Sequence, residues 1–364
     1  MNGVRIAGVG AFVPNRVVPN ARIARAIPGW PAERIEEKTG LRERRFLWDF
    51  DTEKGQALPP PPDAALYPAC NVDMCEVALV KALEMAGLEA QELDAIFLVS
   101  CTTDRLNFSH DAMALHERLG CRSDAFAFVL DDGCGGTPYT MDMARKMIAG
   151  GTFRTIAVIG SAFPSPLMNR DLYTSEIVPE EGAKALNAYL SMYVFGDGAG
   201  AVILRGGGGP DQGILSSFSG NAYDELVLRR GGGALQHAHQ GHGNSVDMAY
   251  VVDGPKVARS YPEYMNRCLE AVLKDAPHLA AEVKRYYFHQ PNKRLLDHFV
   301  RIAGLPADRV ACHVDRYGNT SAAGMLIALA EDLEHGRVRL DSGDLVLIAA
   351  VGANVHYGAQ LVRL

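Results

Sequence analysis

The stretch FVLDDGCGGTPYTMDMARKMIAGG, residues 128–151, contains the order of elements from which most of the chain is predicted to be built. An apolar strand ends in a glycine-rich turn, the turn leads into a helix, and glycines end the helix. HVDRYGNTSAAGMLIALAEDLEHG, residues 313–336, repeats this order. Each copy continues into a hydrophobic strand, at 155–162 and at 345–354. The chain is therefore predicted to contain an internal duplication of a large unit.

The segments upstream of the two copies also match, at 78–104 and at 268–292, because each has a helix, a short polar link, a strand and a polar loop. Strands that alternate with helices predict a layered α/β structure with much parallel pairing. We place the two halves at 1–205 and 206–364. In this register Cys134 and Asn319 occupy nearly equivalent turns, and a pseudo-twofold fold would bring them together at the seam.

Apolar periodicity predicts the individual elements. Strands are expected at 4–10, 93–103, 125–130, 154–160, 198–206, 285–289, 310–314 and 344–351, and those at 93–103 and 125–130 are expected to be buried. Helices are expected at 71–87, 110–120, 135–149, 257–274, 293–303 and 321–335. Residues 48–70 are predicted to form an exposed loop, and the Gly- and His-rich residues 231–245 are predicted to be mobile.

Composition limits the class of protein. With 364 residues, 48% of them hydrophobic, the chain has room for two domains or one large two-halved fold. A net charge of −7 argues against a partner nucleic acid, and no apolar run reaches the ~20 residues of a membrane span. The N-terminus has no secretory signal pattern, and the 7 scattered cysteines include no CxxC pair. The sequence thus predicts a reduced cytoplasmic protein.

Cys134 lies between a predicted strand and a predicted helix. The unpaired N–H groups and the dipole at a helix N-terminus favour a thiolate, whereas the neighbouring Asp131 and Asp132 oppose it. Because side chains alternate along a strand, the two aspartates are expected to face opposite sides. We expect Asp132 to face the pocket, where it binds a polar or cationic substrate group or acts as a base on the acceptor. Alternatively, Cys134 is a small buried packing residue.

His289 ends a predicted strand, a position suited to proton transfer or to donating a hydrogen bond to an oxyanion. Each of His289 and Asn319 has a structural alternative, a locally hydrogen-bonded histidine and a turn or N-cap asparagine. A cysteine nucleophile with a histidine and an asparagine from other loops is, however, an arrangement used in acyl transfer.

Two other motifs have a functional and a structural interpretation. His237, His239 and His242 form HxHxxH, which would suit a metal, but a glycine-rich loop favours a solvated lid. FGDGAG, residues 195–200, resembles a phosphate loop, but no GK[ST] occurs and close strand packing is favoured.

Five motifs connect the chain to a known family: KTGLRERRF (38–46), FGDGAGAVIL (195–204), HQPNKRLLDHF (289–299), DRYGNTSAAGM (315–325) and VGANVHYGAQLVRL (351–364). With them the chain resembles the thiolase-like condensing enzymes, specifically the β-ketoacyl-acyl carrier protein synthase III group. The resemblance implies a thiolase-like five-layered αβαβα sandwich built from two duplicated halves, and a homodimer.

The resemblance also implies roles for individual residues. Cys134 matches the acylated nucleophile, and His289 and Asn319 match the pair that binds the extender thioester carbonyl. The backbone N–H groups of Cys134 and Ala353 match an oxyanion hole, and Phe108 matches a residue that reaches into the partner's acyl pocket. The predicted substrate-binding positions are Lys38, Phe108, Asp132, Gly254, Asn292, Gly352 and Asn354. The implied carrier-protein-binding positions are Gln290, Lys293 and Arg294.

The implied reaction is a decarboxylative Claisen condensation. Cys134 takes an acyl group from a CoA or carrier-protein thioester, a malonyl-type thioester loses CO₂, and its carbanion attacks the acyl-cysteine. No metal and no organic cofactor is expected.

Several residues depart from the family pattern. Asp131, Asp132 and Gly133 replace small apolar residues, Ala353 and Asn354 replace glycines, and Arg34 replaces a tryptophan. They indicate a specialised member, in secondary metabolism. Acyl transfer to a hydroxyl or amine, a cysteine thioesterase and a non-catalytic partner subunit remain as alternatives.

Overall fold

The computed structural model describes residues 3–27, 29–61, 63–105, 108–170, 193–209, 211–224, 226–229 and 250–364. The segment 231–245, with His237, His239 and His242, lies outside these ranges. In the described part of the chain, no helix combines the length and the apolar character needed to cross a membrane.

Two sheets organise the chain, and their strand orders correspond. The first has the order β1 (Gly3–Phe12), β9 (Gly198–Gly208), β8 (Thr155–Ala162), β6 (Ala95–Val99), β7 (Phe126–Leu130). The second has the order β10 (Gly213–Asn221), β15 (His356–Arg363), β14 (Leu345–Val351), β13 (Arg285–Phe288). In each sheet a parallel pair, β6 with β8 or β13 with β14, continues into antiparallel strands. The predicted repetition of strand–helix units is therefore confirmed.

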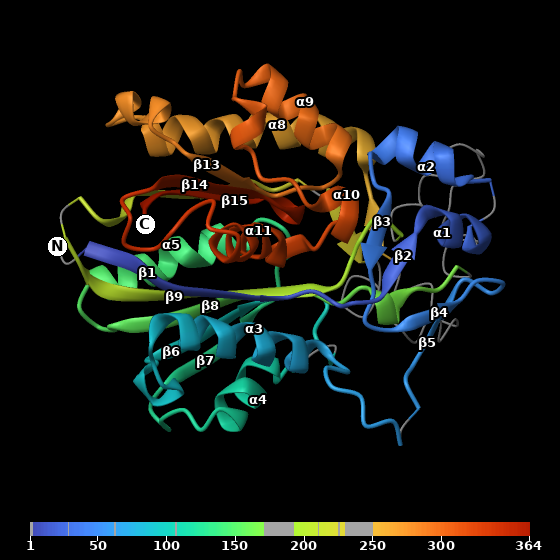
Figure 1. Ribbon diagram of the computed structural model, residues 1–364, viewed down its shortest axis with the longest axis horizontal. Helices are drawn as coiled ribbons and strands as arrows, with labels where there is room; N and C mark the ends of the chain where they lie inside the picture. Colours follow the sequence, from blue (N-terminus) through green and yellow to red (C-terminus); the bar gives the residue numbers. More distant parts are fainter. Residues whose placement is uncertain are drawn as a thin grey trace.

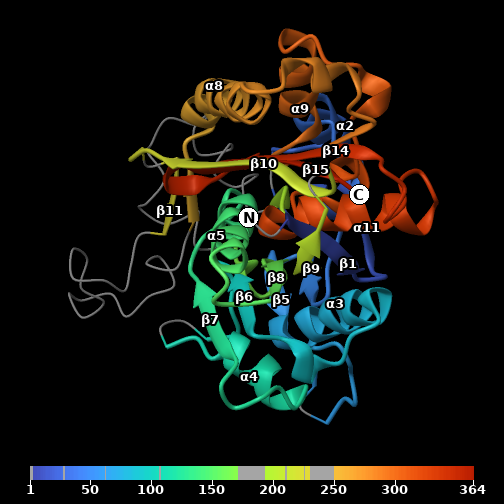
Figure 2. The same ribbon diagram turned by 90° about the vertical axis from the view of Figure 1, so that its left-hand side faces the viewer.

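Helices form three layers around these sheets (Figures 1 and 2). The outer layers are α3 (Asn71–Ala86) with α4 (Asp111–Arg118), and α8 (Gly254–Leu273) with α9 (Lys293–Ile302). Between the sheets lie α5 (Gly136–Ala149) and α11 (Gly324–Glu334). This is the predicted five-layered αβαβα sandwich. Because both faces of each sheet are covered, β6, β8 and β14 are buried along their whole length.

Two glycines of FGDGAG, Gly198 and Gly200, serve the contact between β9 and α11. A Cβ added at Gly200 would lie 2.6 Å from the Cβ of Leu326, so only glycine lets the helix approach the strand this closely. The prediction of close packing is confirmed. The predicted boundary between the halves at 205/206 stays a prediction, although β9 continues to Gly208.

Two predicted strands were wrong in part. β7 is the edge strand of its sheet, and Phe126 and Phe128 are 59% and 36% exposed, because no further strand among the described residues pairs with that edge. In 310–314, a single parallel bridge joins Val310 to Tyr286, and the chain then turns into α10 (Val314–Tyr317).

Several elements were not predicted. In the large sheets these are β10 and β15. The smaller ones are β2 (Val17–Pro19), α1 (Asn20–Ala26), α2 (Ala32–Thr39), β3 (Glu43–Arg45), β4 (Asp49–Asp51), β5 (Gln56–Leu58), β11 (Val227–Arg229) and β12 (Tyr250–Val252). Strands β4 and β5 pair as a hairpin, so residues 48–70 are not the simple loop that their prolines indicated.

Candidate active site

The nucleophile turn, residues 131–136, connects β7 to α5. Cys134 lies two residues before the first residue of α5 and is half-buried. Its neighbour Gly135 touches a second turn, residues 352–356, which we call the C-terminal turn. A Cβ added at Gly352 would lie 2.2 Å from the Gly135 nitrogen, so both glycines are required by the close approach of two backbones.

A third turn brings Asn319 to the same place. The Cys134 Sγ lies 3.5 Å from the Ser321 Oγ, and the Ser321 N–H donates to the Asn319 Oδ1 over 2.8 Å. Because this oxygen is occupied, the amide nitrogen of Asn319 is the group that remains to donate to a ligand. The seam predicted from the duplication thus brings the turns of Cys134 and Asn319 together.

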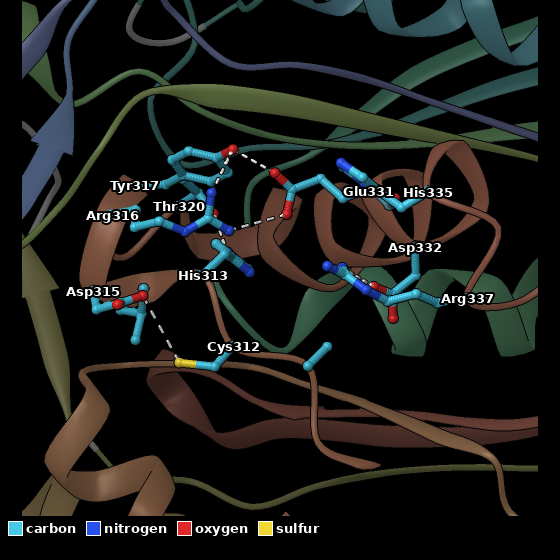
Figure 3. Close-up of polar contacts among 12 residues, drawn as sticks. Cys312, His313, Asp315, Arg316, Tyr317, Thr320, Glu331, Asp332, His335 and Arg337 are labelled. Atoms are coloured by element: carbon cyan, nitrogen blue, oxygen red, sulfur yellow. Dashed lines mark hydrogen bonds and ion pairs between the residues drawn. The ribbon is translucent and has the colours of Figure 1, made fainter. Parts of the chain in front are cut away.

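A network behind this turn holds it in place (Figure 3). The Tyr317 hydroxyl donates to Glu331, and Arg316 contacts the same carboxylate at 3.4 Å, so α10 is tied to α11. Asn319 itself is fixed through its backbone, since its N–H donates to the Val194 carbonyl over 2.8 Å. Ser321 has a φ of 46°, an uncommon left-handed conformation for a residue other than glycine. Such conformations cluster at functional sites.

His289 lies at the end of β13 and is 3% exposed. Its backbone N–H donates to the Ala349 carbonyl over 2.9 Å, and its backbone carbonyl accepts from the Tyr261 hydroxyl over 2.5 Å. Burial, and then the neighbouring His313, lower the pKa of His289 to about 3. The imidazole is therefore neutral near pH 7, a form that donates a hydrogen bond but holds no charge.

Burial also governs the nucleophile. It raises the pKa of the Cys134 thiol to about 11, the contact with Ser321 acts in the opposite direction, and the charge of Asp132 raises it further. The sequence predicted the opposing effects of the helix and the aspartate on the pKa of Cys134, but not the larger effect of burial. The thiol is thus the resting form.

Asp132 faces inward, as predicted, but it already has a partner. Its Oδ2 lies 2.7 Å from the Nδ1 of His356, and its Oδ1 accepts from the Gly133 N–H over 2.7 Å. Asp131 is exposed. Asp132 is therefore already paired within the chain, with the first residue of β15, and its predicted role toward a substrate group stays a prediction. Sequence reasoning missed His356, which is 224 residues away.

Two of the predicted contact residues have structural roles instead. Gln290 is 3% exposed, its amide nitrogen donates to the Ala311 carbonyl, and its oxygen accepts from the His313 N–H. It offers no surface to a carrier protein, contrary to the prediction. The side chain of Asn292 caps α9 by accepting from the Leu295 N–H over 2.9 Å, so it is committed to the helix terminus.

The predicted basic residues lie together where α9 begins and α2 ends. Arg294 donates to the Glu37 carbonyl over 3.0 Å, and a Cβ at Gly40 would lie 2.7 Å from the Cβ of Lys293. The Lys38 side chain is 56% exposed. We call Lys38, Lys293 and Arg294 the basic patch.

The remaining predicted positions have different surroundings. Ala353 begins the short helix η7 (Ala353–Val355), directly after Gly352. Gly254, the first residue of α8, is exposed. Phe108 is 91% exposed. The side chain of Asn354 lies outside the described part of the chain.

Comparisons with known proteins agree with this architecture. The family models described as 3-oxoacyl-[acyl-carrier-protein (ACP)] synthase III and as its C-terminal domain match residues 128–222 and 273–364. The beta-ketoacyl-[acyl-carrier-protein] synthase III of Ruegeria pomeroyi is 30% identical, over 98% of both chains. The 3-oxoacyl-[acyl-carrier-protein] synthase III structure from Aquifex aeolicus is 26% identical, with a TM-score of 0.75 and 100% of both chains covered. OleA of Xanthomonas campestris, at 19% identity over 100% of this chain and 98% of its own, shares the fold with a TM-score of 0.77.

The fold and these matches define a condensing acyltransferase of the thiolase superfamily. Within this class, the chain belongs to the β-ketoacyl-acyl carrier protein synthase III family.

Proposed function

We propose that the protein loads an acyl group onto Cys134 and condenses it with a malonyl-type thioester by decarboxylative Claisen chemistry. One observation carries the proposal: the 3.5 Å contact between Cys134 and Ser321, which sets the turn of Asn319 against the nucleophile turn. A single acyl group on Cys134 would then lie beside the donors that the second half of the chain supplies.

In the first half-reaction, the Cys134 sulfur attacks the thioester carbonyl and the donor thiol leaves. The proposed oxyanion hole consists of the backbone N–H groups of Cys134 and Ala353. Loss of one such donor typically costs about 10²–10³ in rate, because the negative charge develops in the transition state.

In the second half-reaction, His289 and Asn319 donate hydrogen bonds to the carbonyl of the malonyl thioester. These bonds stabilise the enolate that forms as CO₂ leaves, and the enolate carbon attacks the acyl-cysteine carbonyl. A pKa of about 3 suits this role, because the imidazole is then neutral near pH 7. A neutral ring donates its N–H to the carbonyl and keeps the proton. The proposed chemistry uses no metal and no organic cofactor.

We further propose that the acyl groups arrive as acyl-CoA or on an acyl carrier protein. The basic patch supports this, because its three cations outnumber the two carboxylates, Glu37 and Asp297, that pair with Lys38 and Lys293. A positive patch on a protein whose net charge is −7 would steer an acidic partner.

A homodimer is part of the proposal. The edge of the first sheet at β7 exposes Phe126 and Phe128, and an exposed apolar edge strand invites pairing with a second copy. Phe108 would then reach the partner's acyl pocket. Sedimentation of the wild type at twice the mass, and of Phe126→Lys at the mass of one chain, would support this; a monomeric wild type would refute it.

We also propose a specialised member of the family that acts in secondary metabolism. Asp132 and His356 support this, because they place an ion-pairing couple at the nucleophile turn, where the charge of Asp132 acts on Cys134. The acceptor is then more polar than a simple extender unit.

The test is the intact mass of the protein after exposure to a panel of acyl thioesters, followed by malonyl-carrier protein. We expect an acyl adduct that Cys134→Ala abolishes, and release of CO₂ only from the acylated enzyme. Asn319→Ala should keep the adduct and lose the CO₂. An adduct that passes to a hydroxyl or amine instead, or is hydrolysed without an acceptor, would replace condensation with ester or amide formation or a thioesterase. No adduct from any thioester would refute the proposal and favour a non-catalytic subunit.

A further inference from the structure

In the pair formed by Asp132 and His356, the aspartate is buried and held in place, whereas the histidine is partly exposed. Asp132 is 6% exposed, and each of its carboxylate oxygens has a partner, the Gly133 N–H and the His356 ring, at 2.7 Å. The His356 side chain is 32% exposed. A buried, doubly held carboxylate therefore orients a histidine that remains in contact with water.

The pair connects the nucleophile turn to the C-terminal turn. His356 ends the C-terminal turn, and its carbonyl accepts from the Gly352 N–H over 2.9 Å. A Cβ added at Gly135 would lie 2.0 Å from this carbonyl oxygen. The two turns thus touch along their backbones, and the side-chain pair lies at the same junction.

The surroundings of His356 leave Asp132 as its electrostatic partner. On α5, the Tyr139 ring lies 4.9 Å from the imidazole between centroids, and on β10 the opposite residue is the uncharged Asn221. In the described part of the chain, the hydrogen bond and charge of Asp132 raise the pKa of His356. The same carboxylate raises the pKa of Cys134, and Asp131 and Asp132 both act on Cys101 beside it.

We propose that His356 is a positioning residue of the acyl-transfer site, whose imidazolium form holds the two turns together and neutralises Asp132 beside Cys134. The inference rests on the proposed role of Cys134 as the acylated nucleophile. When His356 is charged, the carboxylate is compensated and the Cys134 thiolate forms more readily. When His356 loses its proton, the charge of Asp132 is uncompensated and opposes the thiolate.

The test is the rate at which iodoacetamide alkylates Cys134 from about pH 5.5 to about pH 9, followed by peptide mass, because this reaction needs no acyl donor. At pH values below the pKa of a lone thiol, its alkylation rate rises about tenfold for each unit by which the pH increases. We expect the wild type to gain less than this across the range in which His356 titrates.

Two variants should depart from the wild type on opposite sides. His356→Asn should react about three- to tenfold more slowly at the acid end and match the wild type at the alkaline end, with a constant slope. Asp132→Asn should react faster than the wild type across the whole range, about three- to tenfold at the alkaline end, because it removes the opposing carboxylate whether or not His356 is charged. His278→Asn, on the exposed short helix η4 (Pro277–Ala281), is the control and should follow the wild type.

An unchanged profile in both variants would overturn the inference. So would a shift of both variants in the same direction, which would indicate a general loosening of the site. If His356→Asn does not fold, His356→Gln takes its place, because it also lacks the titrating charge: slower alkylation at the acid end supports the inference and an unchanged rate refutes it. If the alkylation profiles follow these expectations but no thioester gives an acyl adduct, the proposed function is refuted, and the effect of Asp132 and His356 on Cys134 is still supported.

Discussion

Ser321 offers a sharp test of how the site activates its thiol. Its hydroxyl lies 3.5 Å from the Cys134 sulfur and lowers the pKa of a thiol that burial raises to about 11. A net hydrogen bond to a charged group contributes about 1.5 kcal/mol, and about 1.4 kcal/mol equals one pKa unit. Ser321→Ala should therefore slow the alkylation of Cys134 about tenfold at neutral pH, since only the thiolate reacts.

A second substitution separates this effect from backbone strain. Ser321 has a φ of 46°, which costs a residue other than glycine about 1–2 kcal/mol. Ser321→Gly should lose the same factor in alkylation as Ser321→Ala, but it should unfold at higher urea concentration than the alanine variant. Wild-type alkylation in both variants would refute the proposed hydrogen bond, and equal urea midpoints would refute the strain.

Three further predictions follow from contacts elsewhere in the molecule. Gly352→Ala should abolish acyl loading because its Cβ would lie 2.2 Å from the Gly135 nitrogen, whereas Gly209→Ala, with nothing within 4 Å, should load normally; a fully active Gly352→Ala would contradict the close approach. Asp332→Ala should lower the free energy of unfolding by about 3–5 kcal/mol, since it leaves Arg285, at 2.7 Å, and Tyr287 without their buried partner; a loss below about 1 kcal/mol would refute this. Arg285 and Arg337 lower the pKa of Asp332 against its burial, so the stability it contributes is present above the unfolded value of 3.8 and is lost as pH falls through the folded value. The wild type should therefore lose its advantage over Asp332→Asn in acid, as urea titrations at several pH values would show. Arg294→Glu should slow acylation from a carrier protein and weaken its salt dependence while leaving acylation from a small thioester unchanged, and Arg301→Glu, at the other end of α9, is the control; equal effects of the two would argue against the basic patch.

Much of the architecture follows from local sequence patterns. The strands β6 and β14 are unbroken apolar runs bounded by polar turns, and such runs predict buried strands. The duplicated order of strand, glycine turn and helix predicted the seam at which the turns of Cys134 and Asn319 meet.

Other features depended on which distant segments meet. β7 is as apolar as β6, yet it lies at an edge, because sheet order is a property of the whole chain. The role of Ser321 was also missed. A hydroxyl acts on a thiol only where folding places it 3.5 Å away.

By itself, the sequence determined the order of the elements, the duplication and the identity of Cys134, His289 and Asn319 as candidates, because these depend on short-range periodicity and turn chemistry. Only the tertiary structure decided the pKa values of Cys134 and His289. Exclusion of water raises the pKa of Cys134 and lowers that of His289, and it does so because five layers close over the seam. Folding also pairs Asp132, two residues before the nucleophile, with His356, which lies 224 residues away in the sequence.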